Sequence, residues 1–257
     1  FAYAADATPL LLVHSVNAAA SAFEMEPLYT RQALRRPVFA LDLPGFAAAD
    51  KPDILYTPLL MQQAISAAMD WISHHRTAAP IDLAALSLAC EFATQVVLQR
   101  NAPPVRSLAL ISPSGMEGRR GGEKYEAGRT RQSPLALKLL RSTAFGRGLY
   151  GLLTTRVSMR WFLSRTWGTK QFDRRLLEHS RTYAALPGAE HLPLQFISGG
   201  LFTRGIIERY RALPVPVWVA HGHRGSFTDF RACPVRTGVG TTVASHPRER
   251  TGCDGGA

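Results

Sequence analysis

Cysteine is scarce in this sequence: its 257 residues include three, Cys90, Cys233 and Cys253. No two of them stand in a C-x-x-C or another metal-ligand spacing, so the sequence predicts neither a disulfide scaffold nor a zinc site. His221 and His223 form an H-x-H pair, but no third ligand is spaced to join them. We therefore expect a protein without a bound metal.

Long apolar runs are also missing. Charge or glycine interrupts every apolar stretch well before the roughly 18 residues that a membrane-spanning helix needs. No secretory signal is visible, and no internal repeat occurs. These absences favour a cytoplasmic globular protein. A length of 257 residues with 46% hydrophobic content allows one sizeable core, or a core with a small subdomain.

Acidic residues are scarce relative to basic ones: 19 Asp and Glu stand against 30 Lys and Arg, a net charge of +11. The excess lies within residues 116–211, which hold 18 basic and 7 acidic residues, whereas the rest of the chain holds 12 of each. One interpretation is a basic surface that meets an anionic membrane or an acidic substrate. The other, which we favour because charged runs are usually solvated, is the outer face of ordinary helices. No recognition-helix, RNP or zinc-finger pattern accompanies the charge, so we expect no nucleic-acid partner.

The sequence does contain a serine framed by small residues, in the stretch AALSLACEF. Ser87 has Ala85 two positions before it and Ala89 two positions after it. A nucleophilic serine needs small residues at these positions, because a sharp strand-to-helix turn must close around it. Glycine is more usual at both positions, and the pattern also suits a serine at the start of an ordinary helix. Both interpretations stay open on this stretch alone.

The segments around this serine predict a strand before it and a helix after it. PIDLAAL is an apolar run that follows a proline, and LACEFATQVVLQR has apolar residues at helical spacing. Two further strand-like runs, PLLLVHS and RPVFALDLPG, come earlier, and VRSLALISPSG comes later. Strands and helices that alternate at this spacing predict an α/β fold with a mainly parallel sheet and helices on both faces.

Five segments, in order, resemble the α/β-hydrolase fold family. They are LLLVHSVNAAAS, VFALDLPGFAAADKP, ALSLAC, SLALISPSG and PVPVWVAHGHRG, within residues 9–225. The resemblance implies a serine hydrolase with a helical cap inserted after the fourth segment. It divides the chain into an N-terminal core part (1–115), a basic helical cap (116–211) and a C-terminal core part with an irregular tail (212–257). The strands that precede the first segment in the family have no counterpart here, and the chain opens on Phe1, which suggests a fragment.

The resemblance also implies an oxyanion hole, in which backbone N–H groups meet the negative charge that forms in acyl transfer. One donor would be Leu88, the residue after the serine. The other would be Val16, in the loop after the first strand. Where the family usually has His-Gly, this chain has His14 and Ser15. We expect His14 to be a buried structural histidine that shapes this loop.

The rest of a catalytic triad must come late in the chain, in the order serine, acid, histidine. His246 is the candidate base. At the position that best matches the family's acid stands Ser226, which cannot carry the charge that stabilises an imidazolium. Asp229, three residues on, and Glu117, after the fourth segment, are the alternatives. The tail from Arg231 onward has little amphipathic pattern, as a frameshift or a truncation would produce.

The sequence therefore supports two functions. The first is a cofactor-free serine hydrolase that cleaves a small-molecule carboxylic ester, with a lipid-like or aromatic acyl group, through Ser87, His246 and Asp229. A serine at the turn argues against the dehalogenase and epoxide-hydrolase branches, which need a carboxylate nucleophile. The second is an impaired relative that keeps the fold as a binding module. The serine at position 226, where an acid is expected, favours this second function. A lyase that uses the same triad is not separable from the first by sequence.

Overall fold

The computed structural model describes residues 7–76, 80–100, 103–115, 130, 132–141, 143–222 and 242–246, the last of these as backbone only. Its centre is a six-stranded sheet in the order β2-β1-β3-β4-β5-β6, with every neighbouring pair parallel. The strands are β1 (Leu10–Val13), β2 (Val38–Leu41), β3 (Ile81–Leu86), β4 (Val105–Ile111), β5 (Val217–Gly222) and β6 (Thr242–His246). The predicted α/β fold with a parallel sheet is confirmed.

The carboxyl ends of β3, β4, β5 and β6 lie at the same edge of the sheet. Leu86, the last residue of β3, pairs with Ile111, which in turn pairs with Ala220 of β5. Ala220 pairs with Ala244 of β6. In open α/β sheets, ligands bind beyond the carboxyl ends of the strands. A functional site is therefore expected at this edge.

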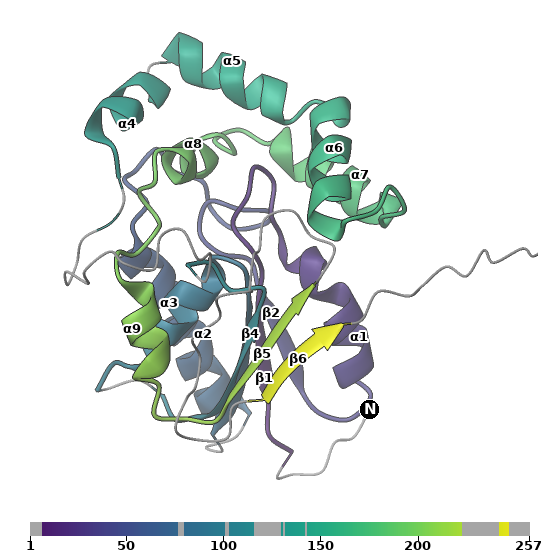
Figure 1. The fold of residues 1–257 in the computed structure, drawn as a ribbon, viewed down its shortest axis with the longest axis vertical. Helices are drawn as coiled ribbons and strands as arrows, with labels where there is room; N and C mark the ends of the chain where they lie inside the picture. The colour runs from purple at the N-terminus through teal and green to yellow at the C-terminus, as the bar shows by residue number, and fades with distance from the viewer. Residues whose placement is uncertain are drawn as a thin grey trace, which may run out of the picture.

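Helices cover both faces of the sheet, as predicted (Figure 1). One face is covered by α2 (Pro58–His75), α3 (Ala89–Val97) and α9 (Ile206–Arg211), and the other by η1 (Ala22–Met25) and α1 (Glu26–Gln32). Leu11 and Val13 of β1 pack in the core of the first face, and Leu10 and Leu12 in that of the second. Successive strand side chains point to opposite faces, so this strand is buried along its whole length.

Helix α2 illustrates how the sequence builds these layers. Pro58 occupies the first turn, where its missing N–H costs nothing, and the Thr57 hydroxyl accepts the N–H of Leu60 at 3.2 Å. The buried residues recur three or four positions apart and so share one side; they are Met61, Ile65, Met69 and Ile72. Burying each such side chain stabilises the fold by about 2 kcal/mol. Among the described residues, no helix combines the length and the apolarity needed to cross a membrane.

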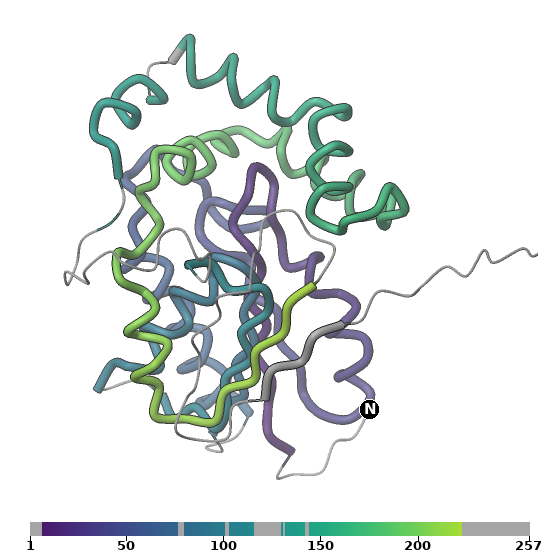
Figure 2. Tube along the Cα trace, in the orientation of Figure 1, coloured from purple at the N-terminus to yellow at the C-terminus, as the bar shows by residue number. Residues whose placement is uncertain are grey.

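Between β4 and β5 the chain leaves the sheet and forms helices beyond its carboxyl edge, at the top of Figure 1. They are α4 (Pro134–Leu140), α5 (Thr143–Leu153), α6 (Arg156–Trp167), α7 (Arg174–Ala184) and α8 (His191–Ile197). Figure 2 traces the chain through these helices and back through α9 to β5. We call α4–α8 the insertion. The domain limits predicted at residues 116 and 211 stay a prediction, since residues 116–129 lie outside the described residues.

Stacking and hydrogen bonds are among the contacts that hold the insertion on the rest of the molecule. His179 of α7 stacks on Phe23 of η1, with 4.4 Å between the ring centres. Gln195 of α8 is buried, accepts the N–H of Tyr56 at 2.8 Å and donates to the carbonyl of Ile54 at 2.7 Å. Because Gln195 meets backbone groups with both ends of its amide, it fixes α8 over the loop that leads into α2.

The opposite, amino-terminal edge of the sheet carries a buried charge cluster. Asp82, the second residue of β3, accepts hydrogen bonds from Arg106 at 2.9 Å, from Ser107 at 2.7 Å and from Arg36. Burial by itself would raise the pKa of Asp82. The hydrogen bonds of Arg106 and Ser107, the charge of Arg106 and the hydrogen bond of Arg36 outweigh burial and hold that pKa below its usual value. The carboxylate therefore stays ionised inside the fold.

Candidate active site

The turn between β3 and α3 consists of Ser87 and Leu88. Ser87 has a φ of 58°, in the left-handed region, which costs a residue other than glycine roughly 1–3 kcal/mol. Neighbouring backbone holds it there: its N–H donates to the carbonyl of Ile111 at 2.8 Å, and its carbonyl accepts the N–H of Cys90 at 3.1 Å. The side chain is partly exposed at the carboxyl edge of the sheet. This is the backbone geometry that presents a nucleophilic serine above a parallel sheet.

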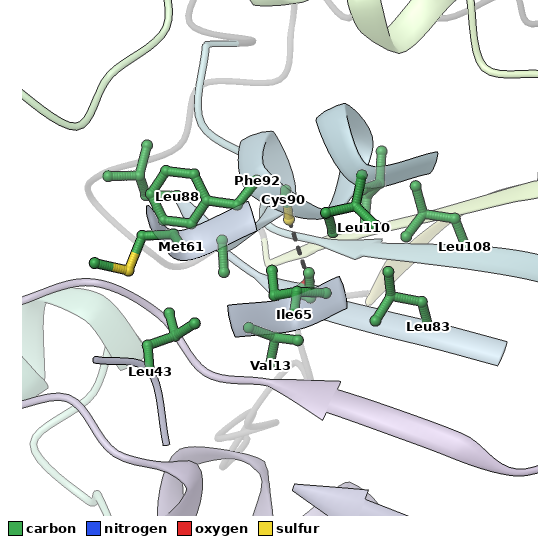
Figure 3. Close-up of a cluster of buried hydrophobic side chains, with 14 of the residues drawn as sticks. Val13, Leu43, Met61, Ile65, Leu83, Leu88, Cys90, Phe92, Leu108 and Leu110 are labelled. Carbon is green, nitrogen blue, oxygen red and sulfur yellow. Dashed lines mark hydrogen bonds between the residues drawn. The ribbon is translucent and has the colours of Figure 1, made fainter. Parts of the chain in front are cut away.

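Small residues allow α3 to leave β3 at this sharp angle. Ala85 and Ala89 are both fully buried. The Cys90 thiol donates to the carbonyl of Ala85 at 3.1 Å. Figure 3 shows Cys90 and Phe92 packed among the buried side chains of the sheet and α2. Burial raises the pKa of the Cys90 thiol well above its usual value. The cysteine is therefore a packing residue rather than a nucleophile.

The two predicted oxyanion donors lie in loops that leave the same edge. Val13 pairs with Ala85, so the loop that carries Val16 leaves the sheet beside the turn at Ser87. Leu88 opens α3, where helical N–H groups lack partners within the helix. Within the residues that the structure describes, the N–H groups of Val16 and Leu88 make no hydrogen bond. Neither N–H is therefore committed to another group within the described residues.

The loop after β1 keeps a fixed shape although serine replaces the usual glycine. Glu24 organises it: one carboxylate oxygen accepts the N–H of Ser15 at 3.0 Å, and the other accepts the side-chain N–H of Asn17 at 2.7 Å. Asn17 also donates to the Ser15 hydroxyl at 2.9 Å, and its carbonyl accepts the N–H of Ala19 at 2.8 Å. Four hydrogen bonds therefore fix the segment on both sides of Val16.

His14 is a structural histidine, as expected. It is fully buried, and its Nε2 accepts the N–H of Leu43 at 3.0 Å. Nδ1 must then carry the proton, which it donates to the carbonyl of Ser15 at 2.6 Å. Burial lowers the pKa of His14, against the opposing charge of Glu24. The neutral ring thus ties the loop after β1 to the loop after β2.

The candidate base also lies at the carboxyl edge. β6 ends at His246, whose Cα pairs with that of Gly222 in β5. Three strand spacings, about 14 Å, separate β6 from β3. Asp229, Ser226 and Glu117 lie outside the described residues, so the base and the acid of the triad stay predictions.

A second histidine stands nearer to the turn. His221, near the end of β5, is partly exposed and lies one strand closer to β3 than His246 does. In the sequence, His221 stands out only as one member of the H-x-H pair with His223. In the part of the chain that the structure describes, no three His, Cys, Asp or Glu side chains gather as a metal site.

Sequence reasoning missed Glu91, a buried carboxylate four residues after Ser87. It accepts the Ser114 hydroxyl at 2.6 Å and the N–H of Thr203 at 2.7 Å. Ser114 in turn donates its N–H to the carbonyl of Ser87 at 3.4 Å. Burial, with the charge of Glu91, raises the pKa of Tyr210, so its hydroxyl stays a donor to the Ser114 carbonyl at 3.1 Å. The one available signal was the single charged residue in the largely apolar stretch LACEFATQVV.

Glu91 also anchors the insertion. Thr203, which it binds, pairs with Thr130 in an isolated antiparallel bridge, and the Arg204 guanidinium donates to the Thr130 carbonyl at 3.2 Å. The chain therefore enters and leaves the insertion side by side, above a carboxylate that also holds the loop contacting Ser87. Glu91 thus connects the base of the insertion to the loop that contacts the turn at Ser87.

The insertion lies directly over the loops at the carboxyl edge. Residues 18–20 of the loop after β1, with Phe46 of the loop after β2, face Tyr150 of α5 and Tyr183 of α7 across a cavity of about 10 Å³. Such a space holds at most one water molecule. The insertion is closed against the core at this point.

No protein-family model and no curated protein sequence matches the chain. Solved structures do match it. A serine hydrolase involved in carbazole degradation superposes with a TM-score of 0.64 over 93% of this chain and 82% of its own, at 19% identity. For the 2-hydroxy-6-oxo-6-phenylhexa-2,4-dienoate hydrolase of Rhodococcus sp. strain RHA1 the TM-score is 0.68, over 95% and 83% of the two chains, at 14% identity. An esterase of Exiguobacterium antarcticum superposes with a TM-score of 0.66 over 93% of this chain and 83% of its own, at 14% identity.

The matching structures differ in their chemistry. They also include a haloalkane dehalogenase from Bradyrhizobium elkanii and an epoxide hydrolase, at 16% and 17% identity. At such identities the likeness concerns the arrangement of the chain. Together with the parallel sheet and the strained turn at Ser87, it shows that this chain has the α/β-hydrolase fold.

Proposed function

We propose that the chain is a cofactor-free serine hydrolase that cleaves a carboxylic ester through an acyl-enzyme on Ser87. One observation carries the proposal: Ser87 sits in a left-handed strand-to-helix turn, and the next residue offers an N–H without a partner among the described residues. Strain of this kind persists where it serves a function. An esterase and a serine hydrolase among the structures of the same fold support the proposed reaction class.

In the first half of the reaction, the Ser87 hydroxyl attacks the ester carbonyl carbon and gives its proton to His246. The carbonyl oxygen becomes an oxyanion, which accepts hydrogen bonds from the N–H groups of Leu88 and Val16. Collapse of this intermediate breaks the ester C–O bond. The alcohol leaves with the proton that His246 returns, and the acyl group stays on Ser87.

In the second half, a water molecule gives its proton to His246 and attacks the acyl carbon. The same two N–H groups stabilise the second oxyanion. The carboxylic acid leaves, and the proton returns from His246 to Ser87. Asp229 orients His246 and stabilises its charged form in both halves. Each oxyanion donor contributes roughly 3 kcal/mol to such a reaction.

The test is turnover of a short-chain nitrophenyl ester by the Ser87→Ala variant. We expect a loss of at least about 10³-fold in kcat/KM with unchanged folding, because the hydroxyl is the attacking group. Ser164→Ala is the matched control: this hydroxyl donates to the carbonyl of Trp161 on α6, and its loss should leave the rate unchanged. Equal turnover by Ser87→Ala and the wild type would refute the proposal.

Ser226 favours a second candidate, an impaired hydrolase that binds without turnover. If Ser226 stands where the acid belongs, Ser226→Asp should raise the rate by up to about 10⁴-fold, the usual cost of a missing partner for the histidine. If Asp229 already serves, Ser226→Asp should change little and Asp229→Asn should cause a loss of similar size. Unchanged rates in both variants would contradict the triad as assigned.

A further inference from the structure

Helices α4, α5 and α6 lie at the outer end of the molecule (Figure 1). Each of them has large apolar side chains that are exposed to solvent. The residues, with their exposed fractions, are Leu135 (79%), Leu139 (53%), Phe145 (50%), Leu152 (65%), Val157 (79%) and Trp161 (57%). We call them the outer apolar set. Soluble monomers seldom gather exposed apolar side chains in this way unless the surface meets a partner or a membrane.

The outer apolar set follows helical spacing. In α6, Val157 and Trp161 are four residues apart and share one side of the helix, whereas the intervening Met159 is buried. The pair in α4 has the same spacing. The pair in α5 is seven residues apart, again on one side, and Tyr150 between them is buried. Each helix thus packs one side on the molecule and leaves an apolar side exposed to solvent.

Positive charge accompanies these outward sides, and negative charge is absent. Residues 132–167 hold six Lys and Arg and no Asp or Glu. By helical geometry, Arg160 and Arg165 lie on either side of the pair Val157 and Trp161. The Arg165 guanidinium lies 5.6 Å from the centre of a Trp161 ring. Arginines that flank a tryptophan can bury their methylene groups at an interface while the charged ends stay in water.

A cationic hollow adjoins α6. It is a cavity of about 170 Å³, lined by four basic residues, one acid and two apolar residues: Arg156, Arg160, Lys170, Arg174, Glu178, Phe172 and Leu177. Arg156 pairs with Glu178 at 2.8 Å. Arg160, Lys170 and Arg174 have no acidic partner among the described residues. Three uncompensated cations around one hollow suit a phosphate group.

We propose that the outward face of α4–α6 docks on the surface of an anionic phospholipid membrane. The outer apolar set, with Trp161 foremost, enters the boundary between headgroups and acyl chains, and Arg160, Lys170 and Arg174 bind headgroup phosphates. Amphipathic helices with a basic flank and a tryptophan bind such surfaces by this combination. The inference does not rest on Ser87 and stands or falls separately from the proposed ester hydrolysis.

The charge on the face decides between a membrane and a second copy of this chain. A symmetric dimer through this face would bring the same set of cations against itself, with no acid in residues 132–167 to pair them. An anionic lipid surface instead supplies the opposite charge along the whole face. Near such a surface each Lys or Arg strengthens binding by about fivefold.

The test is co-sedimentation of the full chain, as Ser87→Ala to prevent turnover, with vesicles of neutral phosphatidylcholine or of phosphatidylcholine with phosphatidylglycerol. We expect binding to the anionic vesicles alone, and a clear loss at high salt, since screening shortens to about 3 Å at 1 M. Trp161→Ala should weaken binding about tenfold, and so should Lys170→Glu. Circular dichroism of each variant checks that it is folded.

Matched controls come from the other end of the molecule. Trp71, exposed on α2, and Arg35, exposed after α1, lie far from the insertion in sequence, and Trp71→Ala and Arg35→Glu should bind like the parent. Equal, negligible binding to both vesicle types would overturn the proposal. A dimer in sedimentation velocity that Trp161→Ala dissolves would assign the face to a second copy and equally overturn it. Binding of inorganic phosphate without vesicle binding would leave only a soluble-anion site, against the proposal.

Discussion

At the amino end of β3, Asp82 accepts hydrogen bonds from Arg36, Arg106 and Ser107, whereas beyond the carboxyl end the Ser87 hydroxyl makes none within the described residues. The two residues are five positions apart on one buried strand and its turn. At the first, the buried carboxylate is paired with three side chains. At the second, the backbone of Ser87 is strained, and its hydroxyl has no hydrogen-bond partner within the described residues.

This difference separates what stabilises the fold from what serves a ligand. Buried polar groups are nearly always paired, because an unpaired one costs roughly 1–3 kcal/mol. The amino end follows that rule with a two-arginine cluster. The carboxyl end departs from it at the N–H groups of the buried residues Val16 and Leu88, beside the partly exposed Ser87. We therefore propose that one end serves stability and the other chemistry.

The largest effect on stability should come from breaking the amino-end cluster with Asp82→Asn. Two arginines then lose their counter-ion, and we expect a loss of about 2 kcal/mol in the free energy of unfolding, below the range for fully buried pairs because both arginines are partly exposed. Urea denaturation measures it. Asp53→Asn is the control: this exposed carboxylate pairs with Arg141 at 2.9 Å and should cost less than about 0.5 kcal/mol. Ester turnover per folded molecule should not change in either variant, and a large change for Asp82→Asn would contradict the division of labour.

The same variant should alter how stability depends on pH. The pKa of Asp82 is lower in the folded chain than in the unfolded one, so the unfolded chain binds more protons between the two values. The stabilisation is complete above the unfolded pKa, near 4, and is lost as the pH falls through the lower folded pKa. Asp82→Asn should therefore make the free energy of unfolding fall less steeply below about pH 4. An unchanged fall in that range would contradict the stabilising role of the Asp82 carboxylate.

A smaller effect on stability, joined to an effect on rate, should follow Glu91→Gln. The glutamine is isosteric, but it keeps only one acceptor oxygen: if this oxygen accepts the Thr203 N–H, the NH₂ group donates to the Ser114 hydroxyl, whose own proton then loses its acceptor. We expect a loss of about 1–2 kcal/mol in stability and a lower kcat, because Ser114 contacts the backbone of Ser87. Glu208→Gln, on an exposed residue of α9, is the control. A destabilised Glu91→Gln variant with unchanged kcat would show that Glu91 supports only the fold.

Local pattern was enough to predict the sheet and the turn. The apolar runs at β1 and β3 are strands buried on both faces, and the run at β4 is a strand with buried residues on one face. Ser87 stands where β3 changes to a helix, because strand burial and helical spacing are both visible in the local sequence. The structure also has a strand, β6 (Thr242–His246), within the tail that has little amphipathic pattern. His14 was also assigned correctly as a structural residue.

Contacts between distant residues left no such marks. Glu91 meets Thr203 across 112 positions, and Asp82 meets Arg36 across 46, and nothing local distinguishes these charges from solvated ones. The outward sides of α4–α6 could not be told from core-facing sides, since both have the same spacing. The acid of the triad could not be assigned from local pattern, because Ser226 stands at the position that best matches the family's acid and Asp229 follows three residues later.

The central claim, that Ser87 is the nucleophile, is tested most directly by labelling the wild-type chain with a fluorophosphonate probe and mapping the adduct by mass spectrometry. The account predicts one adduct, on the peptide that contains Ser87, and none in Ser87→Ala, because only a serine with a base and oxyanion donors beside it reacts with such a probe. An adduct on another serine, or equal labelling of the variant, would contradict it.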